Sequence, residues 1–544
     1  AAAVRGVPRW LPAAALAGSL AALGLRVLAT VSAGPLWRDE ACSASTAGVA
    51  SFGEFWSRLA LDSFPLLWQL LLRVWTTVLW DGGDAAIRAL GLVIAAALIP
   101  ALWWTSRGLG VVPLASLVAA VTPLLVVWSG VQSRAYGLAA VLLVVLCGAL
   151  WRMVERVTPG RVAAAALAAL LAVHTTYHMS VMVAALLAGA VAVAIVRGER
   201  RLVVLAAAIG GVSAASLVVY AGVLARTREF AKVVYAPVSL DAIARGLPLA
   251  LEPVGELGSV AFAVAVAACA WAVIRTLVAG RRDERAAPGD PAAADADAVL
   301  FAGTAALVAV VGQVPFLLAL RFLVQPWYYP MVVLLVAIAL DVALQRAPMT
   351  STVRTAALGV VAALLALLIL PSAQAVAQRQ SNVDLVAAYL KANARPGDLI
   401  VVYPWHYGVS FQRYYDGPVP FMTVPDIEGH DHYRYDQIAD LMRDPERIKP
   451  GFRRIYQTLQ SGGGVWVVGA PTDEVLPQFP VPAVPSDADP SSWSDNRYSL
   501  LAGFQLRWVL QQASPRAYPV PPLTERRVRD YENPPLTLYS VAPR

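Results

Sequence analysis

Two adjacent carboxylates, Asp39 and Glu40, follow the first long apolar segment of the chain, with Arg38 beside them. A third carboxylate, Asp62, stands shortly before the apolar stretch that begins at Pro65. Ionisable groups at the edge of a bilayer are costly, so a membrane protein that keeps acids there usually uses them. A carboxylate can take a proton from an attacking hydroxyl, which predicts general-base chemistry at this position. The alternative is a solvated loop with ordinary surface acids.

Arginine and tyrosine side chains recur at the ends of other apolar segments. Arg134 and Tyr136 follow the segment 111–128. Arg321 precedes an aromatic stretch that contains Tyr328. An arginine that faces lipid costs about 3 kcal/mol, so these positions predict a cavity or a partner. A guanidinium also matches phosphate oxygens in a fixed fork, which makes Arg134 a candidate anion ligand, with contact to lipid headgroups as the alternative.

Two histidines, His174 and His178, stand four residues apart between apolar segments. That spacing places one above the other on a helix and can hold a metal, but a zinc site needs further ligands. The cysteines show no metal-ligand spacing and are expected to be structural: Cys42, Cys147 and Cys269. A hydrogen-bonding role for the two histidines is therefore favoured over a metal site.

The composition indicates an integral membrane protein. Hydrophobic residues make up 58% of the 544 residues and charged residues only 15%, and the mean hydropathy is +0.60. The formal net charge of +7 falls mostly between apolar segments, so membrane topology explains it better than affinity for nucleic acid. Arginine far outnumbers lysine, and alanine and valine are abundant, which indicates a bacterial chain from a GC-rich genome. No cleavable signal peptide is recognised, and the first apolar segment is expected to be retained.

Eleven segments are long and apolar enough to be predicted as membrane spans. They cover residues 10–31, 85–106, 111–128, 134–151, 161–176, 178–197, 201–222, 258–279, 298–320, 325–344 and 352–371. The external loop 33–84 between the first two spans carries the acidic residues. Its apolar part, 65–80, is short and contains Arg73, which fits a helix that lies along the interface.

Arginine clusters on alternate connections predict the orientation. Those assigned to the cytoplasmic side are Arg5, Arg9, Arg107, Arg152, Arg156, Arg161, Arg197, Arg200, Arg201, Arg281, Arg282, Arg285, Arg346 and Arg354. Arginine-rich connections stay in the cytoplasm, so the N-terminus is predicted there. The acidic residues, Arg134, His174, His178, Arg226, Arg228 and Arg321 then gather at the external face. The pattern holds only if 65–80 is not a span.

Residues 372–544 have the composition of a soluble domain, predicted to be extracytoplasmic because an odd number of spans precedes it. Helices are predicted at 382–394 and 451–460, and strands at 399–403, 464–468 and 536–541. This alternation is typical of a small α/β layer structure. The glycine-rich run 461–464 precedes a strand, so it is expected to be a turn rather than a phosphate-binding loop.

Taken in order along the chain, these motifs resemble the GT-C superfamily of polyprenyl-phosphate-dependent glycosyltransferases. The similarity is to the family 39 and protein O-mannosyltransferase-like branch, which includes lipid A aminoarabinose transferases. The matching elements are Asp39-Glu40, Asp62-Ser63-Phe64-Pro65-Leu66, Ser133-Arg134-Ala135-Tyr136, Thr175-Thr176-Tyr177-His178, Arg321 and the segment 387–401. Each motif is short, and only the ordered set is specific. The branch often has His or Lys and then Pro-Pro where this chain has Phe64-Pro65, so any role of that histidine is absent here.

The resemblance implies a GT-C-type catalytic membrane domain over residues 1–371 in a bacterial inner membrane. A sugar would move, with inversion, from a polyprenyl-phosphate donor to a hydroxyl acceptor on the external face. Asp39 is implied as the general base with Glu40 as the alternative, while Asp62 would orient the acceptor or hold a divalent cation. The donor phosphate would be bound by Arg134, Tyr136, Arg321, Arg226, Arg228 and Lys232. His174, His178 and Tyr328 would form a polar wall of the site.

Two other classes of protein stay open. A transporter or flippase of a lipid-linked sugar would also place charges between spans, although no inverted repeat is seen, and a non-catalytic scaffold is the third reading. The sugar is not specified, and the acceptor is a protein, a glycolipid or a cell-wall glycan. In the soluble domain, residues 405–407 and 430–433 carry aromatic and polar groups that suit either a sugar face or an ordinary loop.

Overall fold

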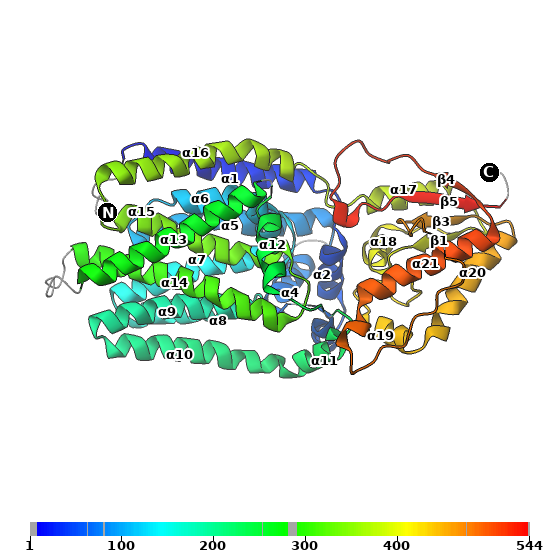
Figure 1. Cartoon of the computed structure of the whole chain (residues 1–544), viewed down its shortest axis with the longest axis horizontal. Coiled ribbons are helices and arrows are strands. Elements are labelled where there is room, and N and C mark those ends of the chain that lie inside the picture. The colour runs from blue at the N-terminus through cyan, green and yellow to red at the C-terminus, as the bar shows by residue number, and fades with distance from the viewer. Residues whose placement is uncertain are drawn as a thin grey trace.

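Apolar segments form a bundle of helices at one end of the molecule, and an α/β unit caps the other end, in the computed structural model (Figure 1). The structure describes residues 8–541 apart from 63, 80–81, 235, 253, 281–290 and 475. Five residues named above lie outside this described part: Arg5, Ser63, Arg281, Arg282 and Arg285.

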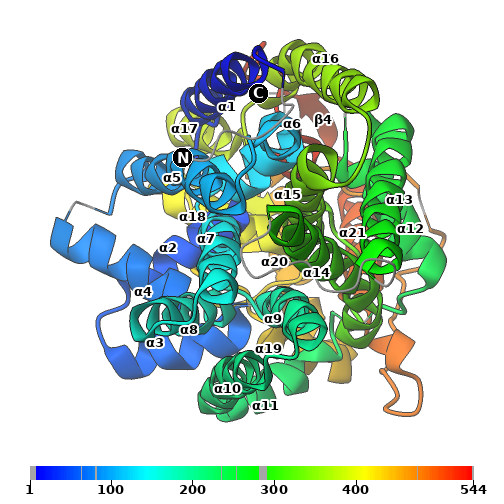
Figure 2. The ribbon, with the colours of Figure 1, turned by 90° about the vertical axis from the view of Figure 1, so that its left-hand side faces the viewer.

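The bundle helices run side by side along the long axis of the molecule, as the end-on view in Figure 2 shows. They are α1 (Leu11–Ser32), α5 (Asp84–Leu109), α6 (Leu114–Val121), α7 (Ala135–Glu155), α8 (Pro159–Val173), α9 (Met179–Arg197), α10 (Arg200–Ser216), α11 (Ala221–Ala231), α13 (Gly255–Gly280), α14 (Pro291–Leu320), α15 (Pro330–Arg346) and α16 (Ser351–Val376). Shorter helices lie near the junction with the α/β unit: α2 (Arg38–Gly48), α3 (Phe52–Arg58), α4 (Leu66–Val74) and α12 (Leu240–Ala250).

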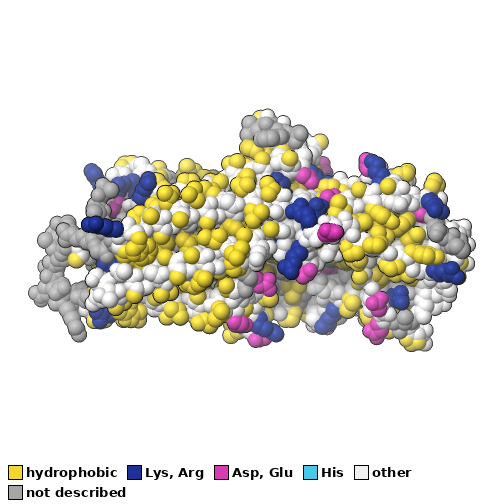
Figure 3. All heavy atoms as spheres, turned by 90° about the horizontal axis from the view of Figure 1, so that it is seen from above, with side chains coloured by type: hydrophobic (Ala, Val, Ile, Leu, Met, Phe, Trp, Pro, Cys, Tyr) yellow, Lys and Arg dark blue, Asp and Glu magenta, His cyan; other side chains and the backbone are white. Residues whose placement is uncertain are grey.

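Eight helices in the described part of the chain are long and apolar enough to cross a membrane. One of them continues through α10 and α11 from Arg200 to Phe230. Hydrophobic side chains cover the face of the bundle seen in Figure 3, while charged side chains gather towards its ends. The chain is therefore a membrane-embedded, mostly helical protein. The other three predicted spans contain shorter helices, namely α6 with a π-helical continuation, α8 and α15, so the count of eleven stays a prediction.

The apolar segment 65–80 forms a helix shorter than the candidate spans, as α8 also does. It forms α4 and a π-helical turn, Trp75–Leu79. Trp68 and Leu72 are buried against α2 and α5, in a small core that also includes Ile87. The external, interfacial position of this segment stays a prediction.

Arginines at the far end of the bundle make contacts with neighbouring helices. Arg197 at the end of α9 lies 2.7 Å from Asp297 of α14, and Arg346 at the end of α15 pairs with Asp295. Arg152 of α7 donates to the carbonyl of Trp104 at 2.8 Å. These three arginines, which the sequence pattern assigns to one side of the membrane, thus share one end of the bundle, opposite the α/β unit (Figure 1).

The α/β unit is built on a five-stranded sheet with the order β2-β1-β3-β5-β4. Its strands are β1 (Leu399–Val402), β2 (Phe421–Thr423), β3 (Val465–Val468), β4 (Arg516–Pro519) and β5 (Leu536–Ser540), and its helices are α17 (Val383–Asn393), α18 (Gly408–Tyr414), α19 (Tyr435–Arg443), α20 (Lys449–Gln460) and α21 (Asp495–Ala513). β1 pairs in parallel with β2 and β3, whereas β5 is antiparallel to β3 and β4. Alternate residues of β1 face opposite cores, with Val401 in the core of α19–α21 and Ile400 in that of α17 and α18.

Five elements of this unit match the sequence prediction within a few residues: α17, β1, α20, β3 and β5. The unit is attached to the bundle by polar contacts. Arg413 of α18 lies 2.7 Å from Asp84 of α5, and the Tyr414 hydroxyl accepts from the backbone N–H of Leu36 at 2.6 Å. These contacts fix the unit over the end of the bundle that carries α2.

Candidate functional site

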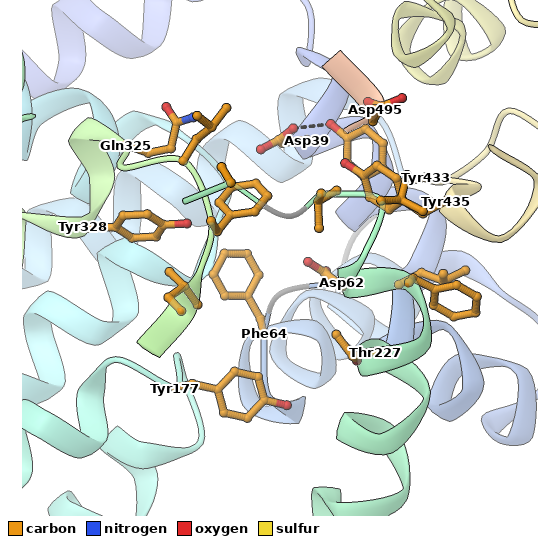
Figure 4. Close-up of a pocket in the computed structure, with 18 of the residues that line it drawn as sticks. Asp39, Asp62, Phe64, Tyr177, Thr227, Gln325, Tyr328, Tyr433, Tyr435 and Asp495 are labelled. Carbon is orange, nitrogen blue, oxygen red and sulfur yellow. Dashed lines mark hydrogen bonds between the residues drawn. The ribbon is translucent and has the colours of Figure 1, made fainter. Parts of the chain in front are cut away.

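A cavity of about 570 Å³ lies between the end of the bundle and the α/β unit. The bundle side contributes Asp39, Asp62 and Arg134, and the α/β unit contributes Tyr433 and Tyr435. Figure 4 shows Asp39, Asp62, Tyr433 and Tyr435 around one space, with Asp39 beside the two tyrosines and Asp62 pointing into the cavity. The site therefore joins segments that are several hundred residues apart in the sequence.

Helix α2 positions the acidic pair. Trp37 is extended and the helix begins at Arg38, so both carboxylates lie in its first turn, where negative charge stabilises a helix. The Glu40 carboxylate turns back and accepts from the backbone N–H of Trp37 at 3.2 Å. Successive residues of a helix are rotated by about 100°, so the neighbouring carboxylate of Asp39 points elsewhere.

Glu40 belongs to a buried ion pair rather than to the cavity. Its side chain is 0% exposed, pairs with Arg88 and accepts from the backbone N–H of Ser133 at 2.8 Å. Arg88 also donates to the carbonyl of Pro35 at 2.7 Å. Glu40 is not among the residues that line the cavity, and its contacts assign it to holding α2 against α5.

One carboxylate oxygen of Asp39 is held by a hydrogen bond, and the other is not. The Tyr433 hydroxyl donates to Oδ1, and Arg38 Nε lies 3.6 Å from the same oxygen. Oδ2 lies 3.6 Å from Arg134 Nη2 and accepts no hydrogen bond from any described residue. The side chain is 18% exposed, so this oxygen can accept a proton from a molecule in the cavity.

Arg134 stands between the two cavity carboxylates. Its Nη1 donates to the carbonyl of Asp39 and to Ser43 Oγ, both at 2.9 Å. Nη2 lies 3.8 Å from Asp62 Oδ1, and the guanidinium carbon is 4.4 Å from the centre of the Phe64 ring. Nη2 makes no hydrogen bond in the part of the chain that the structure describes, so it can donate to an anionic group of a ligand.

Tyr136, His178 and Tyr328 also line the cavity. His178 is hydrogen-bonded to Gln313, which donates to the carbonyl of Tyr328 at 3.0 Å. This agrees with the hydrogen-bonding role predicted for His178. His174 lies outside the lining and is hydrogen-bonded to Tyr220 at 2.6 Å and Ser216 at 3.0 Å. The described residues contain no group of three or more His, Cys, Asp or Glu side chains placed to hold a metal, and the divalent cation near Asp62 stays a prediction.

Three arginines predicted for the phosphate are exposed and do not line the cavity: Arg226, Arg228 and Arg321. Their neighbours do, because Leu224, Thr227 and Phe230 of α11 and Phe322 and Leu323 after α14 form one wall. Lys232, predicted with them, is also exposed and pairs with Asp487 at 2.7 Å. The segments were thus correctly placed at this end of the molecule, but their cations face outwards.

The α/β unit contributes residues that the sequence did not assign to the site. Tyr433 and His406 lie in segments noted for their aromatic and polar groups, but Tyr435 and Asp495 carried no such signal. Burial raises the pKa of Tyr433 well above its usual value, so its hydroxyl stays protonated and donates to Asp39. Burial, reinforced by the charge of Arg38, lowers the pKa of His406 well below its usual value, so its imidazole is neutral at pH 7.

Comparison with known proteins gives no match: no family model matches the chain, and no curated protein does. The similarity to GT-C glycosyltransferases therefore stays a prediction from short motifs. The function has to be inferred from the cavity itself, which holds two carboxylates, a guanidinium with a free donor and an apolar wall.

Proposed function

We propose that this chain is a membrane glycosyltransferase that moves a sugar from a polyprenyl-phosphate-linked donor to a hydroxyl acceptor. The observation that carries the proposal is the pairing of Asp39 and Arg134 in one cavity. The two side chains are 3.6 Å apart, and each keeps one polar atom without a hydrogen bond in the described part of the chain. A proton acceptor next to an anion ligand is the minimum that displacement of a phosphate by a hydroxyl requires.

The other walls of the cavity suit an amphipathic donor. Phe230, Val233, Phe316, Leu320 and Leu323 make one side apolar. Two of these residues also reach the outer surface, since Leu320 is 39% and Leu323 44% exposed. An isoprenoid chain in the bilayer could therefore contact this wall while its phosphate and sugar occupy the polar part near Arg134.

The reaction would be a direct displacement. The acceptor hydroxyl gives its proton to Asp39 Oδ2 as its oxygen bonds to the anomeric carbon. The bond from that carbon to the phosphate oxygen breaks, and the polyprenyl phosphate leaves with the electron pair. Attack opposite the leaving group inverts the anomeric centre. General-base catalysis of this kind contributes about 10²–10⁴-fold, and Arg134 Nη2 would stabilise the charge that grows on the phosphate.

The remaining residues would hold these two groups in place. The Tyr433 hydroxyl and Arg38 fix one oxygen of Asp39 and leave the other for the acceptor. Asp62 lies 3.8 Å from Arg134 Nη2 and balances its charge, and it is also placed to orient the acceptor. Glu40 would act only through the packing of α2.

The proposal puts the cavity on the extracytoplasmic side of a bacterial inner membrane. The arginine-rich end of the bundle lies opposite the α/β unit, and arginine-rich ends stay in the cytoplasm. A donor on a polyprenyl lipid reaches that external face without a soluble nucleotide sugar, and the acceptor would be a protein, a glycolipid or a cell-wall glycan there.

Transfer by the purified protein tests the proposal against a flippase and against a scaffold. The protein is placed in lipid vesicles with a polyprenyl phosphate that carries a radiolabelled sugar, and envelope material is added as the acceptor. A transferase releases polyprenyl phosphate and moves the label to the acceptor. Movement of an intact donor between leaflets without release would identify a flippase. If neither transfer nor movement occurs, a structural role is the reading that remains.

A further inference from the structure

The cavity has a second wall, made by the α/β unit, that differs from the apolar one. We propose that this wall is the acceptor subsite and that the acceptor is a neutral carbohydrate chain. The inference deepens the proposed transferase function and rests on it, because a ligand bound here is an acceptor only if the protein transfers a sugar. The wall is defined by His406, Tyr433, Tyr435 and Asp495 and is called the glycan wall below.

Three polar groups of the glycan wall are left for a ligand. The Tyr435 hydroxyl and the His406 imidazole make no hydrogen bond to any described residue. Asp495 accepts from Trp405 Nε1 at 3.0 Å and from Ser499 Oγ at 3.2 Å, but both bonds go to Oδ1, and Oδ2 has no such bond within the described chain. None of these atoms is fully buried without a partner, and all three residues line the cavity, so each group is open to a hydrogen bond with a ligand there.

The tyrosines of this wall form a fixed aromatic surface. The rings of Tyr433 and Tyr435 are stacked 5.6 Å apart with their planes at 20°. The Trp405 ring meets both edge-on, at 6.2 Å and 5.5 Å between centroids, and its hydrogen bond to Asp495 holds it in place. Rings beside a carboxylate, a phenol and a neutral imidazole suit a sugar, which offers C–H groups to the rings and hydroxyls to the polar atoms.

The glycan wall adjoins the proposed base. Tyr433 bonds Asp39 Oδ1 directly, and in Figure 4 Asp39 lies between the tyrosine pair and the side that carries Gln325 and Tyr328. A glycan held on this wall would therefore present a hydroxyl to the free Oδ2 of Asp39. The donor, held along the apolar wall, would bring its anomeric carbon to the oxygen of that hydroxyl.

A peptide acceptor fits this wall less well than a glycan. Extended peptides are commonly bound through the backbone groups of an exposed strand edge. Among the described residues, the α/β unit contributes to the cavity lining only from helices and loops. None of the lining residues lies in β1 to β5. The groups that are free are side-chain groups, as expected for recognition of hydroxyls.

Binding of small acceptors without donor tests this inference separately from transfer. The full-length protein in detergent is applied to a slide that carries neutral oligosaccharides of mannose, arabinose, galactose and glucose, with serine- and threonine-containing peptides beside them. We expect oligosaccharides to be retained over peptides. Tyr435→Phe and Asp495→Asn should each weaken that binding about tenfold, because each removes a hydrogen bond to the ligand. The controls Tyr456→Phe and Asp440→Asn change exposed residues outside the cavity and should bind as the wild type does.

Transfer kinetics give a second measurement. With a bound oligosaccharide as acceptor, Tyr435→Phe should raise the KM for the acceptor about tenfold and leave donor affinity unchanged. Glycan binding that depends on both residues supports the glycan wall even if no sugar is transferred, in which case the transferase proposal fails instead. Preference for peptides, or glycan binding that neither variant weakens, would overturn the inference whatever the transfer assay shows.

Discussion

Replacing Glu40 by Gln should lower the stability of the protein and leave the chemistry of the site unchanged. The Glu40 side chain is 0% exposed, pairs with Arg88 and accepts from two backbone N–H groups. The amide cannot neutralise Arg88, so the variant loses the charge balance between Glu40 and this buried guanidinium. Removing one member of a buried pair costs about 3–5 kcal/mol. An unfolding entropy of about 2.1 cal/mol/K per residue gives about 1 °C per kcal/mol for a chain of 544 residues, so the apparent Tm should fall by about 3–4 °C.

The measurement is thermal unfolding of the purified protein in detergent, with transfer assayed below the transition. The matched double variant Glu40→Gln/Arg88→Met removes both charges of the pair, so it should recover much of the lost stability. Folded Glu40→Gln should keep a transfer rate within a few-fold of the wild type. The reasoning fails if Glu40→Gln melts like the wild type and yet has lost activity, since Glu40 would then be the base.

Three further outcomes are expected. Arg134→Lys should weaken donor binding about tenfold in a lipid-binding assay, because a point charge cannot reproduce the fork that holds Asp39, Ser43 and a phosphate together; unchanged affinity would exclude Arg134 as the phosphate ligand. Burial raises the pKa of Glu532 from 4.5 to about 7, so the folded state keeps a proton that the unfolded chain loses, and stability should fall by about 3 kcal/mol as the pH rises through that window. Glu532→Gln should flatten this slope in a thermal-shift series, and an unaltered slope would assign it to another group. Single cysteines at Gly82 and Ser461, with the native three removed, should react with an impermeant thiol reagent on intact cells, whereas one at Gly198 should react only after lysis; the reverse pattern would invert the topology.

Many helices of the bundle can be predicted from the length of their apolar segments alone, because a helix that faces lipid needs a long uncharged run. The outer helices α10, α13 and α16 meet that criterion. The criterion is weaker for α6 and α15, whose apolar residues are explained equally well by burial between other helices, and for α8, which has only 15 residues. In the α/β unit, two strands were not predicted, β2 and β4. β2 has only three residues, and β4 is mostly exposed without apolar alternation, so neither gives a strand signal in the sequence.

Some residues of the candidate site could also be predicted from the sequence, and others could not. Asp39, Asp62, Arg134, Tyr136, His178 and Tyr328 were predictable because the ends of apolar segments meet at one end of a bundle. Sequence could not separate Asp39 from Glu40, since one step along α2 decides which carboxylate faces the cavity. It also could not pair Tyr433 with Asp39, because that contact depends on how the α/β unit docks and joins residues with no local relation.

The transfer rate of Asp39→Asn tests the central claim most directly. Asparagine keeps the size of the side chain and an oxygen for the Tyr433 hydroxyl, but it cannot take the proton of the acceptor. With labelled donor and envelope acceptor, the rate should fall by about 10²–10⁴-fold while donor affinity and the apparent Tm stay close to those of the wild type. A folded Asp39→Asn protein that transfers sugar at nearly the wild-type rate would contradict the account.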